Sequence, residues 1–238
     1  MDAAKEIWSV WFAIGTAFIA AALLAAIIHG YLRSKAPTRV YAYEKRVYLY
    51  RLPVRIWHWL NAALFIYLGI TGFLGYFGVI SRDGMETWHN VVTKQCLLAL
   101  WIYMVIVNIV SGNGKHYKIK LNGLPRRCAA QAKYYLSGIF KKEEPPFHAT
   151  ESLKFNPIQQ VTYAAVVYLM IPALIISGIF TFVAKSEIAR HIHIAFSILS
   201  VIFLITHIYL CLCGAYITQY IKGMIDGYHR RSKSDNGV

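Results

Sequence analysis

Acidic residues are scarce in this chain, and long stretches of it carry no charge at all. Asp and Glu number 11 against 25 Lys and Arg, and only 15% of the 238 residues are charged. Hydrophobic residues make up 57%, and the mean hydropathy is +0.44, which lies outside the usual soluble range. A net charge of +14 would suggest nucleic acid in a soluble protein, but here the charge is confined to segments between apolar runs. We therefore expect an integral membrane protein with no nucleic-acid partner.

Two cofactor-binding patterns are also missing. The four cysteines form no Cys-x-x-Cys pair, so the chain has no pattern for an iron–sulfur cluster of its own. Cys211 and Cys213 point to different sides of a helix, and we interpret them as small apolar filler. A glycine-rich nucleotide-binding motif is absent as well. The chain is therefore not expected to act alone on a soluble substrate.

Five apolar runs are long enough to cross a bilayer. The first follows six residues without net positive charge and is long for a signal peptide, so we expect a permanent span. The expected spans are about 8–28, 56–77, 89–111, 157–184 and 191–220. The predicted fold class is all-α: a four-helix integral membrane bundle within 56–220, plus one extra N-terminal transmembrane helix within 1–31.

Basic residues gather in three segments between or after these spans: 32–55, 112–156 and the tail 221–238. With five spans, all three fall on one side of the membrane, and the positive-inside rule places that side in the cytoplasm. The N-terminus is then outside and the C-terminus inside. Within the long loop 112–156, residues 126–140 are expected to form an amphipathic helix on the membrane surface.

The last apolar run contains ionisable side chains where they are costly. His193 and His207 are fourteen residues apart, which is nearly four helical turns or about 21 Å along the axis. The two imidazoles therefore share one helix face, one near each membrane surface. Ionisable groups in an apolar span are functional candidates by default. His191 is rotated by about 160° from His207, so we expect an interfacial role for it, with ligation as the lesser alternative.

Two more histidines complete a pattern of pairs. His58 begins the second span, on the cytoplasmic side, and His89 begins the third, on the outer side. By depth, His89 pairs with His193 near the outer face and His58 pairs with His207 near the inner face. The remaining histidines are expected at the interface (His29) or in solvated loops and the tail: His116, His148 and His229.

Two histidines per site in an apolar helical setting, without carboxylate or thiolate, indicate bis-imidazole haem iron. Zinc usually takes four protein ligands, or three and an open position. A proton relay usually includes Asp or Glu, and these spans have no interior acid. Four structural histidines that bond carbonyls or anchor at the interface are the remaining alternative. Gly69, Gly72 and Gly75, three residues apart along the second span, fit close approach of a helix or of a flat ring equally well.

The order of these motifs resembles a known family. Arg55-Ile-Trp-His-Trp59, a histidine opening the next span, and a last span ending in His207-Ile-Tyr209 are similar to the di-haem cytochrome b subunit of membrane-bound nickel–iron hydrogenases, a cytochrome b561-like protein. The gamma subunit of formate dehydrogenase and the thiosulfate-reductase cytochrome b are similar more distantly. The likeness extends over about residues 44–230 and includes Phe155-Asn-Pro-Ile-Gln-Gln160. These families usually have four spans, so the first span here is an addition.

The resemblance implies that the four matching histidines ligate two b haems and that a quinone binds near the inner one. Asn156 matches a family position near the quinone, and Gln160 and Tyr209 are added as candidates because of their proximity. The implied partners are an extracytoplasmic iron–sulfur subunit and a large catalytic subunit, such as a hydrogenase or formate dehydrogenase. The chain would carry electrons between that iron–sulfur subunit and the quinone pool of a bacterial or archaeal cytoplasmic membrane.

Three other functions are kept as alternatives. A quinol-oxidising anchor of a thiosulfate- or fumarate-reductase-type complex would also move electrons to or from quinone, but the fumarate-reductase type has ligands on four different helices. A free-standing transmembrane ferric or ascorbate reductase would need no iron–sulfur partner. A haem-free anchor or transporter subunit would show no b-type absorption.

Overall fold

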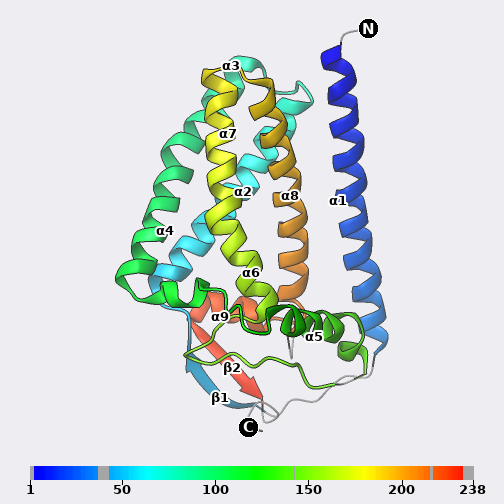
Figure 1. The fold of residues 1–238 in the computed structure, drawn as a ribbon, viewed down its shortest axis with the longest axis vertical. Coiled ribbons are helices and arrows are strands. Elements are labelled where there is room, and N and C mark those ends of the chain that lie inside the picture. Colours follow the sequence, from blue (N-terminus) through cyan, green and yellow to red (C-terminus); the bar gives the residue numbers. More distant parts are fainter. Residues whose placement is uncertain (1–2, 37–42, 142, 215–216, 233–238) are drawn as a thin grey trace.

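The computed structural model describes residues 3–36, 43–141, 143–214 and 217–232, and its main feature is a bundle of long helical segments (Figure 1). Counted along the chain, the third long helical segment consists of α3 and α4 joined by two π-helical turns, and the fourth consists of α6 and α7 joined by another. The long elements are α1 (Ala3–Lys35), α2 (Leu52–Tyr76), α3 (Arg82–Met85) with the π-turns Glu86–Asn90 and Thr93–Leu97, α4 (Leu98–Val110), α6 (Pro157–Ala165) with the π-turn Val166–Met170, α7 (Ile171–Val183) and α8 (Glu187–Cys211).

Among the described residues, five helical segments are long and apolar enough to cross a membrane: Ala13–Lys35, Leu52–Tyr76, Asp83–Val110, Pro157–Val183 and Glu187–Cys211. The predicted all-α integral membrane fold is therefore confirmed, with each predicted span overlapping one of these helices. The fifth span was predicted to continue to residue 220, but α8 ends at Cys211. Beyond this end, Arg33 of α1 donates to the carbonyl oxygens of Leu212 and Gly214, as side chains often do at the end of a helix.

The smaller elements lie together at one end of the bundle, with the C-terminus, and we call this end the sheet end (Figure 1). They are β1 (Tyr43–Tyr48), the 3-10 turn Asn113–Tyr117, α5 (Leu124–Leu136), the 3-10 turn Gly138–Phe140, α9 (Gln219–Asp226) and β2 (Tyr228–Ser232). The opposite end, which we call the α3 end, carries α3 and the N-terminus (Figure 1).

The segment before α2 and the C-terminal tail, for which no strand was predicted, pair with each other. β1 and β2 run antiparallel, with Val47 opposite His229 and Tyr48 opposite Tyr228. The predicted amphipathic helix over 126–140 is present as α5, shifted to Leu124–Leu136, and the chain continues in a 3-10 turn. Pro125 in the first turn of α5 explains its earlier start, because proline fits that position without losing a bond.

The outer surface of the bundle is apolar, unlike that of a soluble protein. Large apolar side chains such as Phe18 and Ile109 face outward, at 60% and 74% exposed, as lipid contact requires. Polar side chains such as Thr71, Asn108 and Ser177 are buried between the helices. Since lipid is as apolar as the helices, such packed polar contacts help to hold helices together in a membrane.

The extra helix α1 packs along α8 and is bound to it by polar contacts at both ends. Near the α3 end, Trp11 Nε1 donates to His191 Nδ1 at 2.7 Å. Near the sheet end, His29 contacts the hydroxyl of Tyr209, and Arg33 holds the end of α8 as described above. His191 and Tyr209 therefore face α1, which agrees with the predicted rotation of His191 away from the face of His193 and His207.

We expect Arg33→Gln to loosen the α1–α8 contact, because the guanidinium is the donor for two carbonyls at the end of α8. A hydrogen bond to a charged group contributes about 1.5–3 kcal/mol, which corresponds to a fall of roughly 5 °C in the melting temperature. Thermal unfolding of the purified protein in detergent measures the melting temperature. Lys35→Gln is the matched control, since Lys35 lies only over the ring of Tyr31 on its own helix. An equal fall in both variants would contradict a role for the Arg33 contact.

Candidate functional site

His89 and His193 lie beside each other towards the α3 end of the bundle. Their ring centroids are 6.2 Å apart, and the ring planes are at 82°. His193 belongs to α8, whereas His89 belongs to the π-helical turn Glu86–Asn90. Single π-helical turns are frequent at functional sites. The two histidines therefore form one local pair, contributed by the third and fifth spanning segments.

Both histidines of this pair are held in the same protonation form by neighbours on other helices. Thr71 Oγ1 donates to the carbonyl of Tyr67 and lies 2.9 Å from His89 Nδ1, so it accepts the Nδ1 proton. His193 Nδ1 lies 3.1 Å from the carbonyl oxygen of Leu174, which can only accept. Each imidazole thus has its proton on Nδ1 and a free lone pair on Nε2. That is the form in which a histidine binds a metal while its other nitrogen is held by a neighbour.

A hydroxyl residue followed by glycine stands against each histidine of this pair, as Thr71-Gly72 on α2 and Ser177-Gly178 on α7. Ser177 Oγ lies 3.1 Å from His193 Nδ1. A Cβ added at Gly72 would lie 3.3 Å from Cε1 of His89, and one at Gly178 would lie 3.2 Å from Cε1 of His193. The glycines therefore leave room for the rings that the hydroxyls orient. This arrangement was not predicted, and its only signal in the sequence is the repeated Thr/Ser-Gly step.

The three glycines predicted to permit close approach behave differently. Gly72 lies against an imidazole, while Gly75 lies against the side chain of Met85, so its small size serves helix packing. A Cβ added at Gly69 would meet no described atom within 4 Å, so Gly69 serves neither purpose. Helix packing thus accounts for Gly75, and the neighbour of Gly72 is the imidazole of His89.

His58 of α2 and His207 of α8 form the second pair, towards the sheet end, with ring centroids 6.0 Å apart and planes at 52°. His207 stacks on Phe203 one turn earlier, at 5.5 Å and 20°, and the ring of Tyr163 meets it at 6.1 Å. His58 Nδ1 is buried and has no hydrogen-bond partner among the described residues. This pair is thus positioned by aromatic contacts, whereas hydroxyl groups orient the pair at the α3 end.

The separations at both pairs fit one metal ion between two imidazoles. Two metal–nitrogen bonds of about 2.0 Å, plus the distance from each nitrogen to its ring centre, give about 6 Å between centroids. Within the described residues, no group of three or more His, Cys, Asp or Glu side chains could hold a metal ion. The protein therefore offers two ligands per site, which fits a haem, whose own ring supplies the other iron ligands.

Asn156 and Tyr209, two of the three candidate quinone residues, are connected through Tyr135 of α5. Asn156 Nδ2 donates to the Tyr135 hydroxyl at 3.2 Å. Tyr209 donates to His29 Nδ1, because His29 Nε2 donates to the Tyr135 carbonyl at 2.7 Å and must carry the ring proton. Burial raises the pKa of Tyr135, so its hydroxyl stays protonated. Four polar side chains from α1, α5, α8 and the start of α6 therefore meet at the sheet end.

Gln160, the third candidate, is only 1% exposed, and both ends of its amide bind backbone. Its Nε2 donates to the carbonyl of Phe155 at 2.9 Å, and its Oε1 accepts from the amide of Lys120 at 3.3 Å. Asn156 also has a structural role, since its Oδ1 accepts from the Gln159 amide at 2.9 Å and caps α6. Gln160 thus ties the long loop to α6, while Asn156 keeps its amide nitrogen for other contacts.

The expectation that the loop and tail histidines are solvated is wrong for two of them. His116 is 5% exposed and His229 is 9% exposed. His116 lies against the ring of Phe155, with centroids 6.5 Å apart, and His229 stacks on Tyr220 at 6.4 Å. They are buried because the 3-10 turn Asn113–Tyr117 and β2 fold back onto the end of the bundle, which charge and hydropathy did not predict.

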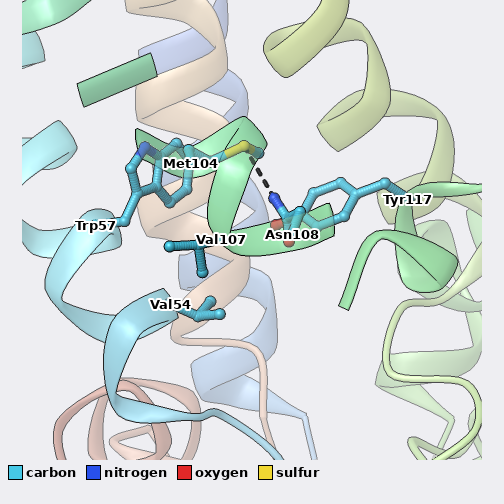
Figure 2. A pocket seen from close by; sticks show the side chains of 6 residues that line it. All are labelled: Val54, Trp57, Met104, Val107, Asn108 and Tyr117. Atoms are coloured by element: carbon cyan, nitrogen blue, oxygen red, sulfur yellow. Dashed lines mark hydrogen bonds between the residues drawn. The ribbon is translucent and has the colours of Figure 1, made fainter. Parts of the chain in front are cut away.

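A small pocket opens at the sheet end between α2, α4 and the 3-10 turn Asn113–Tyr117 (Figure 2). Inside it, Asn108 Nδ2 points at Met104 Sδ, 2.9 Å away (Figure 2). Trp57, which also lines the pocket, directly precedes His58 in α2, and its Nε1 is buried without a partner among the described residues. The lining residues are Val54, Trp57, Met104, Val107, Asn108 and Tyr117.

A helical membrane bundle with paired histidines inside it defines a class, the membrane-embedded b-type cytochromes. A sequence model described as prokaryotic cytochrome b561 matches residues 49–227, three quarters of the chain, and the chain belongs to this family. The family implies b-type haem and a role in membrane electron transfer in a prokaryote, and the predicted resemblance is confirmed.

One relative from Escherichia coli (strain K12), named "Putative cytochrome YdhU", is 35% identical over 237 residues, covering 94% of this chain and 91% of that protein. This match is longer than that of the family model, which begins after α1, and it includes at least part of α1. No solved structure matches the chain.

We expect Thr71→Val to weaken haem binding at the α3 end far more than Ser177→Ala does. Valine removes the hydroxyl that accepts from His89 Nδ1, whereas His193 keeps the carbonyl of Leu174 when Ser177 is lost. Loss of such a supporting partner typically lowers metal affinity about 10–100-fold. The haem-to-protein ratio after purification and washing measures retention. Equal haem loss in the two variants would show that these hydroxyls do not hold the ligands.

Proposed function

We propose that this chain is the membrane-anchoring cytochrome b subunit of a respiratory oxidoreductase of the hydrogenase type. It carries electrons between an extracytoplasmic iron–sulfur subunit and the membrane quinone pool, through two b haems. The observation that carries the proposal is the presence of two histidine pairs towards opposite ends of one bundle. Within each pair, the ring centroids are 6.0 or 6.2 Å apart. Each pair includes one histidine of α8, so one helix spans the whole path.

The chain's own residues hold and orient the two cofactors. His89 and His193 ligate the haem at the α3 end, and His58 and His207 ligate the one at the sheet end. A bis-histidine haem supplies reversible one-electron exchange at iron. The protein adds the apolar surroundings and the bonds to the second imidazole nitrogen, both of which tune the potential.

The positive-inside rule supports the proposed orientation. The described parts of the basic segments 32–55, 112–156 and 221–238 lie at the sheet end (Figure 1), while the α3 end carries few charges. The sheet end then faces the cytoplasm and the α3 end faces the outside, with the N-terminus outside. An iron–sulfur partner would dock at the α3 end, and the large catalytic subunit would bind to that partner.

The polar group formed by Asn156, Tyr209, Tyr135 and His29 supports a quinone site at the sheet end. Quinone carbonyls need donors, and Asn156 Nδ2 keeps a second proton while the Tyr135 hydroxyl, which accepts from it, keeps its own. The Tyr209 hydroxyl donates to His29 beside them. Gln160 belongs to the same region and braces it through its backbone bonds. Reduction there would draw protons from the cytoplasmic side.

Two features favour this proposal over the alternatives. Two of the four histidines lie on α8, unlike the four-helix ligand distribution of the fumarate-reductase type. The absence of a cysteine pattern for an iron–sulfur cluster suits a subunit that receives electrons from a partner. The reverse direction of flow, from quinol to a thiosulfate-reductase-type partner, uses the same residues and differs only in the partner's potential.

We expect His207→Ala and His89→Ala each to lower the haem content from two to one per chain, with different haems lost. The dithionite-reduced absorption spectrum and a pyridine haemochrome assay measure this, and redox titration distinguishes the haem that remains. His191→Ala is the matched control on α8, because His191 faces Trp11 of α1 and not the bundle. Loss of both haems, or of neither, in the ligand variants would overturn the assignment.

We expect Asn156→Asp to impair reaction with quinone while leaving the haem content unchanged. The carboxylate still accepts the Gln159 amide and caps α6, but the donor from Nδ2 is lost. Loss of a hydrogen-bond donor to a quinone carbonyl should raise the KM for quinone about tenfold. The rate of haem oxidation at increasing concentrations of a soluble quinone analogue measures this KM. Ser186→Asp, at the cap of α8 on the α3 end, is the control. An unchanged KM in Asn156→Asp would remove Asn156 from the quinone site.

A further inference from the structure

Four basic side chains converge at the sheet end, outside the histidine pairs and the quinone residues. We call Arg51, Lys115, His116 and Lys154 the basic cluster. They come from three separate segments: the cap of α2, the 3-10 turn Asn113–Tyr117, and the loop before α6. The charges of Arg51 and Lys115 act on Lys154, and those of Lys154 and Lys115 act on His116.

Lys154 is fixed in place from inside the bundle. Its Nζ donates to Oδ1 of Asn113 at 3.2 Å, and Asn113 Nδ2 donates to Oδ1 of the buried Asn108 at 2.7 Å. Asn108 lies in α4 and lines the pocket of Figure 2. The ammonium group of Lys154 is therefore held by Asn113, which is itself held by Asn108, whereas surface lysines usually extend freely into solvent.

No acid neutralises this cluster within the described part of the chain, where none of its four members forms an ion pair with Asp or Glu. Burial, and then the neighbouring positive charges, lower the pKa of Lys154 to about 8. The same two causes lower the pKa of His116 to about 4. Holding like charges together in a partly buried place costs free energy unless an anion joins them.

A second observation at the same place points to a ligand. His116 is 5% exposed, and its Nδ1 is buried without a hydrogen-bond partner among the described residues. Buried polar atoms almost always have a partner in a folded protein, so an isolated one needs an explanation. Its imidazole packs on Phe155, the residue directly after Lys154.

We propose that the basic cluster binds the oxyanion of a carboxylate or phosphate group, with Lys154 and Arg51 as its charged contacts and His116 as a buried donor. Two sources present this chemistry at the sheet end. One is a propionate of the haem proposed at His58 and His207, since Arg51 caps α2 seven residues before His58. The other is the headgroup of an anionic phospholipid at the membrane surface. The first source rests on the proposed function and the second does not.

The test compares Lys154→Gln with Lys118→Gln in the purified holoprotein, since Lys118 is an exposed lysine of the same loop outside the cluster. Redox titration follows the two haems, and native mass spectrometry counts bound phosphatidylglycerol after addition of vesicles that contain it. Arg51→Gln is a second variant, at an exposed position where folding is not at risk.

If the anion is a propionate, Lys154→Gln lowers the potential of the haem that His207→Ala removes and leaves the other unchanged, because lost positive charge favours ferric iron. If the anion is a phospholipid, Lys154→Gln weakens phosphatidylglycerol binding about tenfold or more, and both potentials stay as in the control. The proposal is overturned if Lys154→Gln and Arg51→Gln match Lys118→Gln in both measurements. A chain without haem would refute the proposed function, whereas the phospholipid count would still test the cluster.

Discussion

The two histidine pairs depend on how α8 is held between α7 and α1. Fourteen residues put His193 and His207 on one face of α8, so any rotation of this helix would displace both imidazoles together. The opposite face is fixed by α1, through Trp11 on His191 near one end and His29 on Tyr209 near the other. α1 lies outside the range of the family model. It nevertheless sets the rotation of the helix that contributes to both pairs, so it acts as part of the core and not only as an anchor.

The two pairs are built by different means, and this difference has consequences for the ligands. At the α3 end, Thr71 and the Leu174 carbonyl both take the Nδ1 proton, so the tautomer and the ring orientation are fixed before any metal binds. At the sheet end, His207 stacks on Phe203, its Nε2 lies 3.8 Å from Cys211 Sγ, and His58 Nδ1 has no described partner. Stacking orients a ring plane but does not choose a tautomer, and a thiol can donate or accept. The sheet-end pair is therefore the less constrained of the two.

The number of spans and their order followed from hydropathy, because this pattern repeats along one dimension. The β1–β2 pairing and the burial of His116 and His229 did not, since they depend on segments far apart in the sequence folding onto each other. Thr71-Gly72 and Ser177-Gly178 are an intermediate case. Each step is visible in the sequence, but only the packing of α2 and α7 shows that both serve an imidazole on another helix. Local periodicity predicted the bundle, whereas contacts between helices had to be observed.

The charge distribution makes the two ends of the proposed electron path unequal. Cations near a redox centre stabilise its reduced form and so raise its potential, with a strength that grows as solvent is excluded. The basic residues gather at the sheet end, and Lys154 is held there by Asn113 and partly withdrawn from water. At the α3 end, the half-buried Arg190 is paired with Glu187, and Lys94 lies over the ring of Phe182. The field of the protein therefore raises the potential of a redox centre at the sheet end relative to one at the α3 end. This difference would hold an electron near the proposed quinone residues Asn156 and Tyr209, whereas the net direction of flow depends on the potential of the partner.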